Sequence, residues 1–128
     1  MKLLLDTHVF IWWADEPEKL SSAARAALQD ETNVLMLSVV SLWEIQIKTQ
    51  LSKLKLSLTL KELVESQQSA NDLQILPVTL AHVLALDVLP FHHKDPFDRL
   101  LIAQSIEEDA TLVSADSKLS AYSIKLLQ

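Results

Sequence analysis

Residues 92–104 read His92-His93-Lys94-Asp95-Pro96-Phe97-Asp98-Arg99-Leu100-Leu101-Ile102-Ala103-Gln104, a stretch that begins charged and turns apolar. Pro96 suits the first turn of a helix, because its fixed φ fits there and its missing N–H would be unbonded in any case. Asp95 can cap this helix, and Asp98 lies within its first turn. The stretch therefore predicts a helix over 96–108, buried on most sides, with two carboxylates and Arg99 at its amino end. Such a helix suggests a functional site.

The composition is that of one folded domain covering residues 1–128. The chain has 128 residues, of which 49% are hydrophobic, and a net charge of −6. It contains no cysteine, which excludes disulfides and thiolate chemistry, and no glycine, which excludes the glycine-rich phosphate loops. No apolar run reaches the ~18 residues of a membrane span. Because an acid follows the first apolar run too early for a signal peptide, we expect a cytoplasmic protein that does not enter a membrane.

Short apolar runs alternate with helical patterns along the whole chain. The predicted strands are 2–5, 34–38, 73–77, 111–114 and, at an edge, 123–127. The predicted helices are 9–14, 22–29, 41–50, 59–70, 79–87 and 96–108. The alternation predicts an α/β fold with a mostly parallel sheet of four to five strands.

Four acidic residues occupy corresponding places in this pattern. Asp6 follows the first strand, and Glu44 lies in the helix after the second. Asp98 begins the late helix, and Asp116 follows the fourth strand. Since ligands of open α/β sheets bind beyond the carboxyl ends of the strands, we expect these acids to converge there.

Each acid also has a purely structural interpretation. Ser41 and Glu44 have the spacing of a capping box, Asp116 could cap the turn before Lys118, and Asp6 could end its strand in a turn. Taken together, however, several carboxylates at one edge repel one another unless they are protonated or neutralised. A hard divalent cation such as Mg²⁺ or Mn²⁺ would neutralise them and would support phosphodiester hydrolysis.

Histidines and tryptophans offer other chemistry. His8, His92 and His93 could contribute to a zinc site, but no paired ligand spacing supports one. Three tryptophans could stack on nucleobases, although such residues more often fill a core or an interface. These are Trp12, Trp13 and Trp43.

Residues 45–61 form a basic strip in an acidic chain. The strip contains four lysines and no acid: Lys48, Lys53, Lys55 and Lys61. It could hold a phosphate backbone locally, or it could be a solvated helix face and loop.

In sequence order, four motifs resemble the PIN domain, and most closely the VapC-type toxins of toxin–antitoxin pairs. The motifs are Leu4-Leu5-Asp6-Thr7-His8, Ser41-Leu42-Trp43-Glu44-Ile45, Asp95 to Gln104, and Thr111-Leu112-Val113-Ser114-Ala115-Asp116. They span nearly the whole chain, and the third is the most specific of them.

The resemblance implies a three-layer α/β/α sandwich and a Mg²⁺- or Mn²⁺-dependent endoribonuclease. It implies that four acids bind the metal and catalyse the reaction, namely Asp6, Glu44, Asp98 and Asp116, with Thr7 supporting the first acid. It further implies a homodimer held inactive by a small antitoxin protein. For the RNA substrate, we take four residues as candidate phosphate contacts: Lys48, Lys53, Lys55 and Arg99.

The chain departs from the family pattern at one point, and two other functions are possible alternatives. Members of the family often have a glycine near Ser52-Lys53-Leu54, which this chain lacks. A non-catalytic protein-binding module, whose acids are only helix caps, is the alternative function. A receiver-like phosphoacceptor domain is a weaker alternative. Such a domain has paired acids after its first strand, whereas Asp6 has no acidic neighbour.

Overall fold

All five apolar runs join one parallel sheet in the computed structural model, which describes residues 1–128. Its strands are β1 (Lys2–Leu5), β2 (Val34–Ser38), β3 (Gln74–Leu76), β4 (Thr111–Val113) and β5 (Leu126–Leu127). They lie in the order β3-β2-β1-β4-β5, and every pairing is parallel. The predicted α/β class is thus confirmed, with five strands rather than four.

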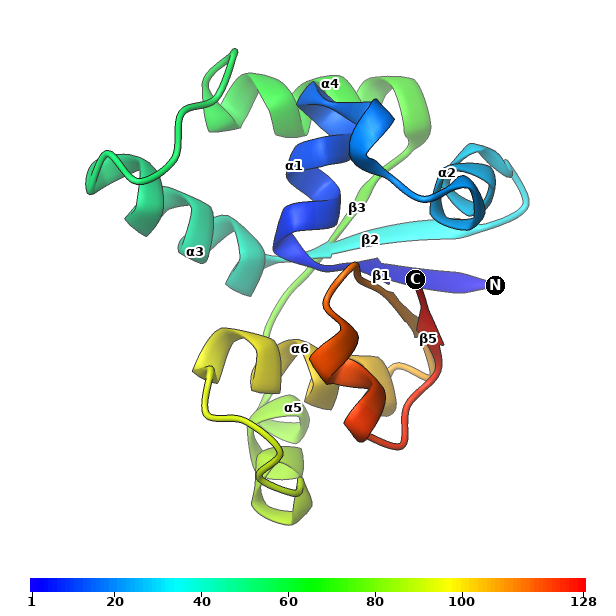
Figure 1. The fold of residues 1–128 in the computed structure, drawn as a ribbon, viewed down its shortest axis with the longest axis vertical. Coiled ribbons are helices and arrows are strands. Elements are labelled where there is room, and N and C mark those ends of the chain that lie inside the picture. Colours follow the sequence, from blue (N-terminus) through cyan, green and yellow to red (C-terminus); the bar gives the residue numbers. More distant parts are fainter.

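Helices cover both faces of this sheet (Figure 1). One face carries α1 (Thr7–Asp15), α2 (Ser22–Gln29), α3 (Val39–Gln50) and α4 (Leu60–Asn71). The other carries α5 (Leu80–Ala85), α6 (Pro96–Glu107) and the 3₁₀ turns η2 (Leu86–Val88) and η3 (Ser117–Ala121); a third such turn, η1 (Pro17–Lys19), follows α1. No helix is both long and apolar enough to cross a membrane.

The central strand β1 supplies side chains to two separate cores. Leu3 and Leu5 point into the core beneath α1, whereas Leu4 points into the core beneath α6. Successive residues of a strand face opposite sides, so a strand that is covered on both faces must be apolar throughout. This is the physical reason why the run Leu3-Leu4-Leu5 shows no polar alternation, and it confirms the three-layer sandwich.

Helix α3 begins two residues earlier than its sequence pattern predicts. The side chain of Ser38, the last residue of β2, accepts a hydrogen bond from the Val40 N–H and caps the helix. The capping-box interpretation of Ser41 and Glu44 is therefore wrong, because both residues lie inside the helix. The caps predicted at Thr59 and Asp95 are present.

The missing glycine after α3 is replaced by a serine in the left-handed conformation. Ser52 has φ of 56°, a region in which a side chain beyond the α-carbon is unfavourable by about 1–2 kcal/mol. Ser52→Gly should therefore raise the free energy of unfolding by about 0.5–1 kcal/mol, net of the extra flexibility of the unfolded chain. Urea denaturation measures the change. Lys53→Gly, at the next residue without positive φ, should instead destabilise the protein; equal effects of both changes would contradict the argument.

Candidate active site

Asp6 lies at the carboxyl end of the central strand and is 8% exposed. One of its carboxylate oxygens accepts a hydrogen bond from the Val9 N–H at 2.9 Å, so that Asp6 caps α1. The other accepts a hydrogen bond from the Ser114 hydroxyl. Burial raises the pKa of Asp6 despite these two hydrogen bonds, which act to lower it. The fold thus holds a carboxylate in a position where its charge is poorly solvated.

Ser114 is a site residue that the sequence analysis did not single out. It follows β4, the strand that pairs with β1, and it therefore lies beside Asp6 although 108 positions separate the two residues. Its oxygen also accepts a hydrogen bond from the Asp116 N–H at 3.0 Å. Only the pairing of β1 with β4 brings this hydroxyl to Asp6, and no local motif of the chain signals that pairing.

If Asp6 binds a metal ion, Ser114→Ala should weaken metal affinity or activity by about 10–100-fold, the usual cost of losing a side chain that orients a metal ligand. Since the Ser114 hydrogen bond lowers the pKa of Asp6, its loss should move the acid limb of the pH–rate profile to higher pH. Ser114→Thr keeps the hydroxyl and should restore the profile. A rate loss in Ser114→Ala with an unchanged profile would indicate a merely structural role.

Glu44 lies within α3, where it is buried and bonded on both of its oxygens. The Thr7 hydroxyl donates to Oε1 at 2.7 Å, and the Lys48 ammonium donates to Oε2 at 2.7 Å. Thr7 therefore supports Glu44, not Asp6 as the resemblance implied. Lys48, one turn along the same helix, provides the counter-charge for Glu44.

Asp98 is the third residue of α6, and Asp95 caps that helix through hydrogen bonds from the Phe97 and Asp98 N–H groups. Burial raises the pKa of Asp98 to about 6, helped by the negative charges of Asp95, Glu44 and Asp6 and opposed by His93. These influences mean that Asp6, Glu44 and Asp98 lie within electrostatic range of one another. These three acids come from the residue after β1, from α3 and from α6.

Asp116 is linked to this group, but its carboxylate caps a 3₁₀ turn. Its Oδ1 accepts a hydrogen bond from the Lys118 N–H at 2.9 Å and caps η3, as its sequence position had suggested. Its backbone N–H is tied to Ser114, which in turn contacts Asp6. Asp116 is therefore connected to the acid group through Ser114.

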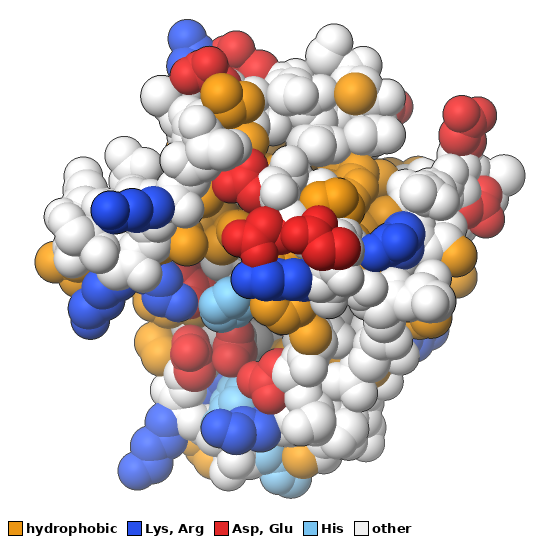
Figure 2. All heavy atoms as spheres, turned by 45° about the horizontal axis from the view of Figure 1, so that its top comes forward, with side chains coloured by type: hydrophobic (Ala, Val, Ile, Leu, Met, Phe, Trp, Pro, Cys, Tyr) orange, Lys and Arg blue, Asp and Glu red, His pale blue; other side chains and the backbone are white.

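The acids do not form a closed metal cage. No group of three or more His, Cys, Asp or Glu side chains is arranged to hold an ion. On the face shown in Figure 2, acidic side chains gather with lysine and arginine side chains beside them. Carboxylate oxygens that raise one another's pKa are a donor set suited to a hard divalent cation, and Mg²⁺ commonly takes one or two protein carboxylates and keeps several waters. The donor chemistry therefore fits Mg²⁺ or Mn²⁺ better than zinc, which requires three or four protein ligands.

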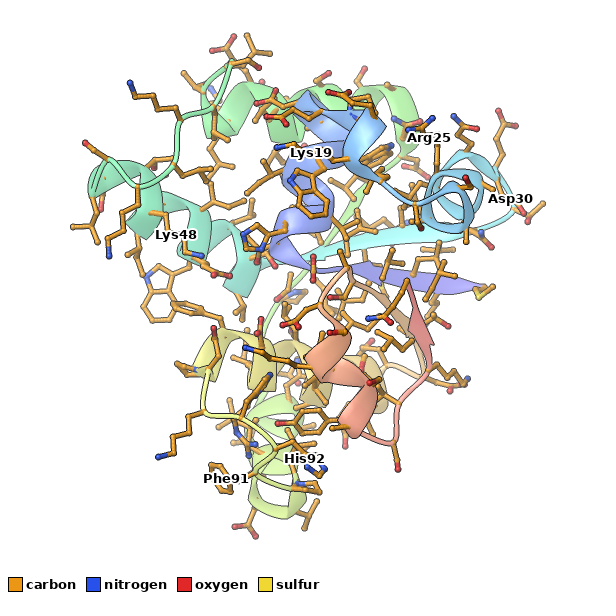
Figure 3. The ribbon with its side chains drawn as sticks, viewed as in Figure 1. Lys19, Arg25, Asp30, Lys48, Phe91 and His92 are labelled. Atoms are coloured by element: carbon orange, nitrogen blue, oxygen red, sulfur yellow. The ribbon has the colours of Figure 1, made fainter.

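Arg99 does not suit the phosphate contact expected of it. It is 6% exposed, and its guanidinium donates to the carbonyl oxygens of Pro90 at 2.8 Å and Leu89 at 3.2 Å. It also lies 3.9 Å from the centroid of the Phe91 ring. Arg99 therefore fixes the loop before α6, which carries Phe91 and His92 (Figure 3). Its guanidinium already donates hydrogen bonds to backbone carbonyl oxygens and is not free to bind a phosphate.

Of the candidate histidines, His93 lies closest to the acids, with its Nε2 3.7 Å from Asp98 Oδ2. The rings of His92 and His93 pack against Tyr122, with centroids 4.7 and 5.4 Å away. Lys53 and Lys55 are exposed in the segment between α3 and α4. No common zinc site emerges from the histidines, while these two lysines remain available to an anion.

The family model described as "PIN domain" matches residues 3–125. The chain belongs to the PIN-domain family. Among curated proteins, Ribonuclease VapC22 of Mycobacterium tuberculosis is 30% identical over 121 residues, which cover 94% of this chain and 91% of that protein.

Solved structures share the PIN fold. VapBC2 from Rickettsia felis, bound to a DNA fragment, matches with a TM-score of 0.72 and 20% identity over 99% of this chain and 98% of that one. A toxin–antitoxin complex from Klebsiella pneumoniae matches with a TM-score of 0.62 and 14% identity, over 98% of this chain and 96% of that one. At these identities the likeness supports the PIN architecture alone.

Proposed function

We propose that this PIN-domain protein is a metal-dependent endoribonuclease and the toxin of a type II toxin–antitoxin pair. The proposal is supported chiefly by the hydrogen bond from Thr7, the residue after Asp6, to Glu44, and by the negative charges of Asp6 and Glu44 that act on Asp98. Of these acids, Glu44 and Asp98 cap no helix, so capping does not explain them. The relative at 30% identity is named a ribonuclease, which supports RNA as the substrate.

Asp6, Glu44 and Asp98 would hold Mg²⁺ or Mn²⁺, with Asp116 at the edge of the group. The bound cation would supply a Lewis acid that activates water and offsets the charge of the phosphoryl group. The chain's own residues orient the acids: Ser114 holds Asp6, and Thr7 holds Glu44.

Three lysines would position the RNA backbone near these acids. Lys53 and Lys55 are exposed and can pair with phosphates, which fixes the register of a strand without reading its bases. Lys48 lies beside Glu44 and could reach a phosphate only by loosening its ion pair with that acid. We therefore propose Lys53 and Lys55, rather than Lys48, as the main phosphate contacts.

Metal addition tests the proposal against its alternative. Mg²⁺ or Mn²⁺ at a hundredfold excess over Kd should stabilise the folded protein by about 2.7 kcal/mol, measured as a rise in Tm, and EDTA should stop RNA cleavage. The rise should disappear in Asp98→Asn. A protein that melts at the same temperature with and without the cation would lack the proposed metal site.

A non-catalytic binding module is the second candidate, and one observation favours it. Asp6, Asp95 and Asp116 each cap a helix or turn in the manner that this alternative requires. If this alternative holds, the parent protein and its acid variants would all fail to cleave RNA. The melting temperature would also not respond to Mg²⁺. The metal titration above therefore separates the two functions.

We also propose the partners that the sequence suggested. An antitoxin protein is supported by the structural relatives, one of which is named a toxin–antitoxin complex. A homodimer is supported by apolar side chains left exposed on and beside α5, of a kind that monomers seldom gather on one surface. They are Leu80, Val83, Leu84, Val88 and Phe91. Because cellular RNA is the proposed substrate, we propose a cytoplasmic location.

A further inference from the structure

Trp43 differs from the other two tryptophans in its exposure to solvent. It is 62% exposed, whereas Trp12 and Trp13 are partly buried against the core beneath α1. A large aromatic side chain in water forgoes the free energy of burial, so a strongly exposed one often marks a binding surface. Filling the core, the usual role of a tryptophan, therefore does not explain Trp43.

The Trp43 ring is held in place although it is exposed. It meets the ring of Phe97 edge to face, with centroids 5.4 Å apart and planes at 71°. This contact joins α3 to α6 and restricts the indole. A restrained aromatic ring loses little conformational entropy when a ligand stacks on it.

The contact joins the two helices that carry Glu44 and Asp98. Trp43 precedes Glu44 on α3, and Phe97 precedes Asp98 on α6. The ring pair thus bridges the same two helices that supply two of the three acids.

Lysines on the same helix and in the segment after it suit a polyanion. Lys48 extends from α3 one turn beyond Glu44 (Figure 3), and Lys53 and Lys55 follow in the exposed segment after the helix. An exposed aromatic side chain beside lysines is the combination by which proteins bind single-stranded nucleic acid. A peptide partner would be served by the apolar ring but not by three lysines.

We propose that Trp43 is a stacking platform for an unpaired nucleobase of the RNA. This inference rests on the proposed nuclease function and adds a base-binding residue to it. Bases within an RNA duplex are already stacked on each other and cannot stack on the indole. The proposed contact therefore requires an unpaired base.

Binding without cleavage tests this inference. In EDTA, a fluorescein-labelled single-stranded oligoadenylate of about twelve nucleotides is titrated with the full chain and followed by anisotropy. Trp43→Ala should weaken binding about tenfold, equivalent to about 1.4 kcal/mol, and Trp43→Phe should fall between the two. Leu51→Ala is the matched control, since Leu51 ends the same helix and is 59% exposed, and it should bind as the parent does. A duplex of the same length should bind Trp43→Ala and the parent equally.

The outcomes separate this inference from the nuclease proposal. If the parent binds single strands and Trp43→Ala binds them equally well, the platform is wrong and the nuclease proposal stands. If light scattering finds that Trp43→Ala changes the oligomeric state, Trp43 belongs to an interface between copies and the platform is likewise wrong. A parent protein that neither binds RNA in EDTA nor cleaves it with Mn²⁺ overturns the nuclease proposal itself.

Discussion

Asp98→Asn should reduce RNA cleavage on the order of 10³-fold, equivalent to about 4 kcal/mol of transition-state stabilisation. Asparagine keeps the shape of Asp98 but removes the negative charge with which this residue would hold a divalent cation. Asp6→Asn should lose activity to a similar extent, while its side-chain oxygen can still cap α1. Single-turnover cleavage of a labelled RNA in Mn²⁺ measures both losses, and circular dichroism checks that both variants fold.

Asp95→Asn provides the matched control for this experiment. Asp95 is three residues from Asp98 and also acidic, but its carboxylate is used to cap α6. Asparagine caps helices as well as aspartate does, so this variant should keep its fold and stay within about tenfold of the parent rate. If Asp95→Asn lost activity while Asp98→Asn cleaved normally, the third acid of the site would be Asp95.

The same Asp98→Asn change should stabilise the protein at neutral pH. The pKa of Asp98 is raised from 3.8 to about 6, chiefly by burial and by the neighbouring negative charges. A full conversion of this shift gives about 3 kcal/mol, but the side chain is 27% exposed and solvent screens part of the effect. We expect Asp98→Asn to raise the free energy of unfolding by about 1–2 kcal/mol in metal-free buffer near pH 8.

The pH dependence of this gain follows from the direction of the shift. A raised pKa means that the folded protein binds the Asp98 proton more tightly than the unfolded chain does. The stability that this proton gives is fully present below the unfolded pKa of 3.8 and is lost as the pH rises through about 6. The difference between parent and variant should therefore vanish near pH 4 and be complete near pH 8. Urea denaturation at both values measures it, with Asp87→Asn, at an exposed acid of η2, as the control. A difference that is the same at both pH values would refute the assigned cause.

The fold and the helix caps could be predicted because their signals are local. A strand covered on both faces must be apolar, so Leu3-Leu4-Leu5 is recognisable without its neighbours. An aspartate before a proline favours the start of a helix, which is why Asp95 and the start of α6 were predicted correctly.

The remaining features depend on distant pairings. Arg99 has the charge of a phosphate ligand, and only the path of the loop at Leu89 and Pro90 shows that backbone carbonyls already accept its hydrogen bonds. Thr7 follows Asp6 in sequence, yet the packing of α1 on α3 directs its hydroxyl to Glu44. Ser114 reaches Asp6 only because β4 adds to the sheet beside β1. Each of these contacts joins elements whose relative placement no local pattern specifies.

The position of β1 between β2 and β4 bears on when the protein can become active during its synthesis. A ribosome makes Asp6 and Glu44 early, but Asp98 and Ser114 leave the exit tunnel only after most of the chain has been translated. Until then the nascent chain lacks the strand that closes one side of β1, and the acid group is incomplete. Under the proposed nuclease function, the topology therefore delays activity until synthesis of the chain is nearly finished.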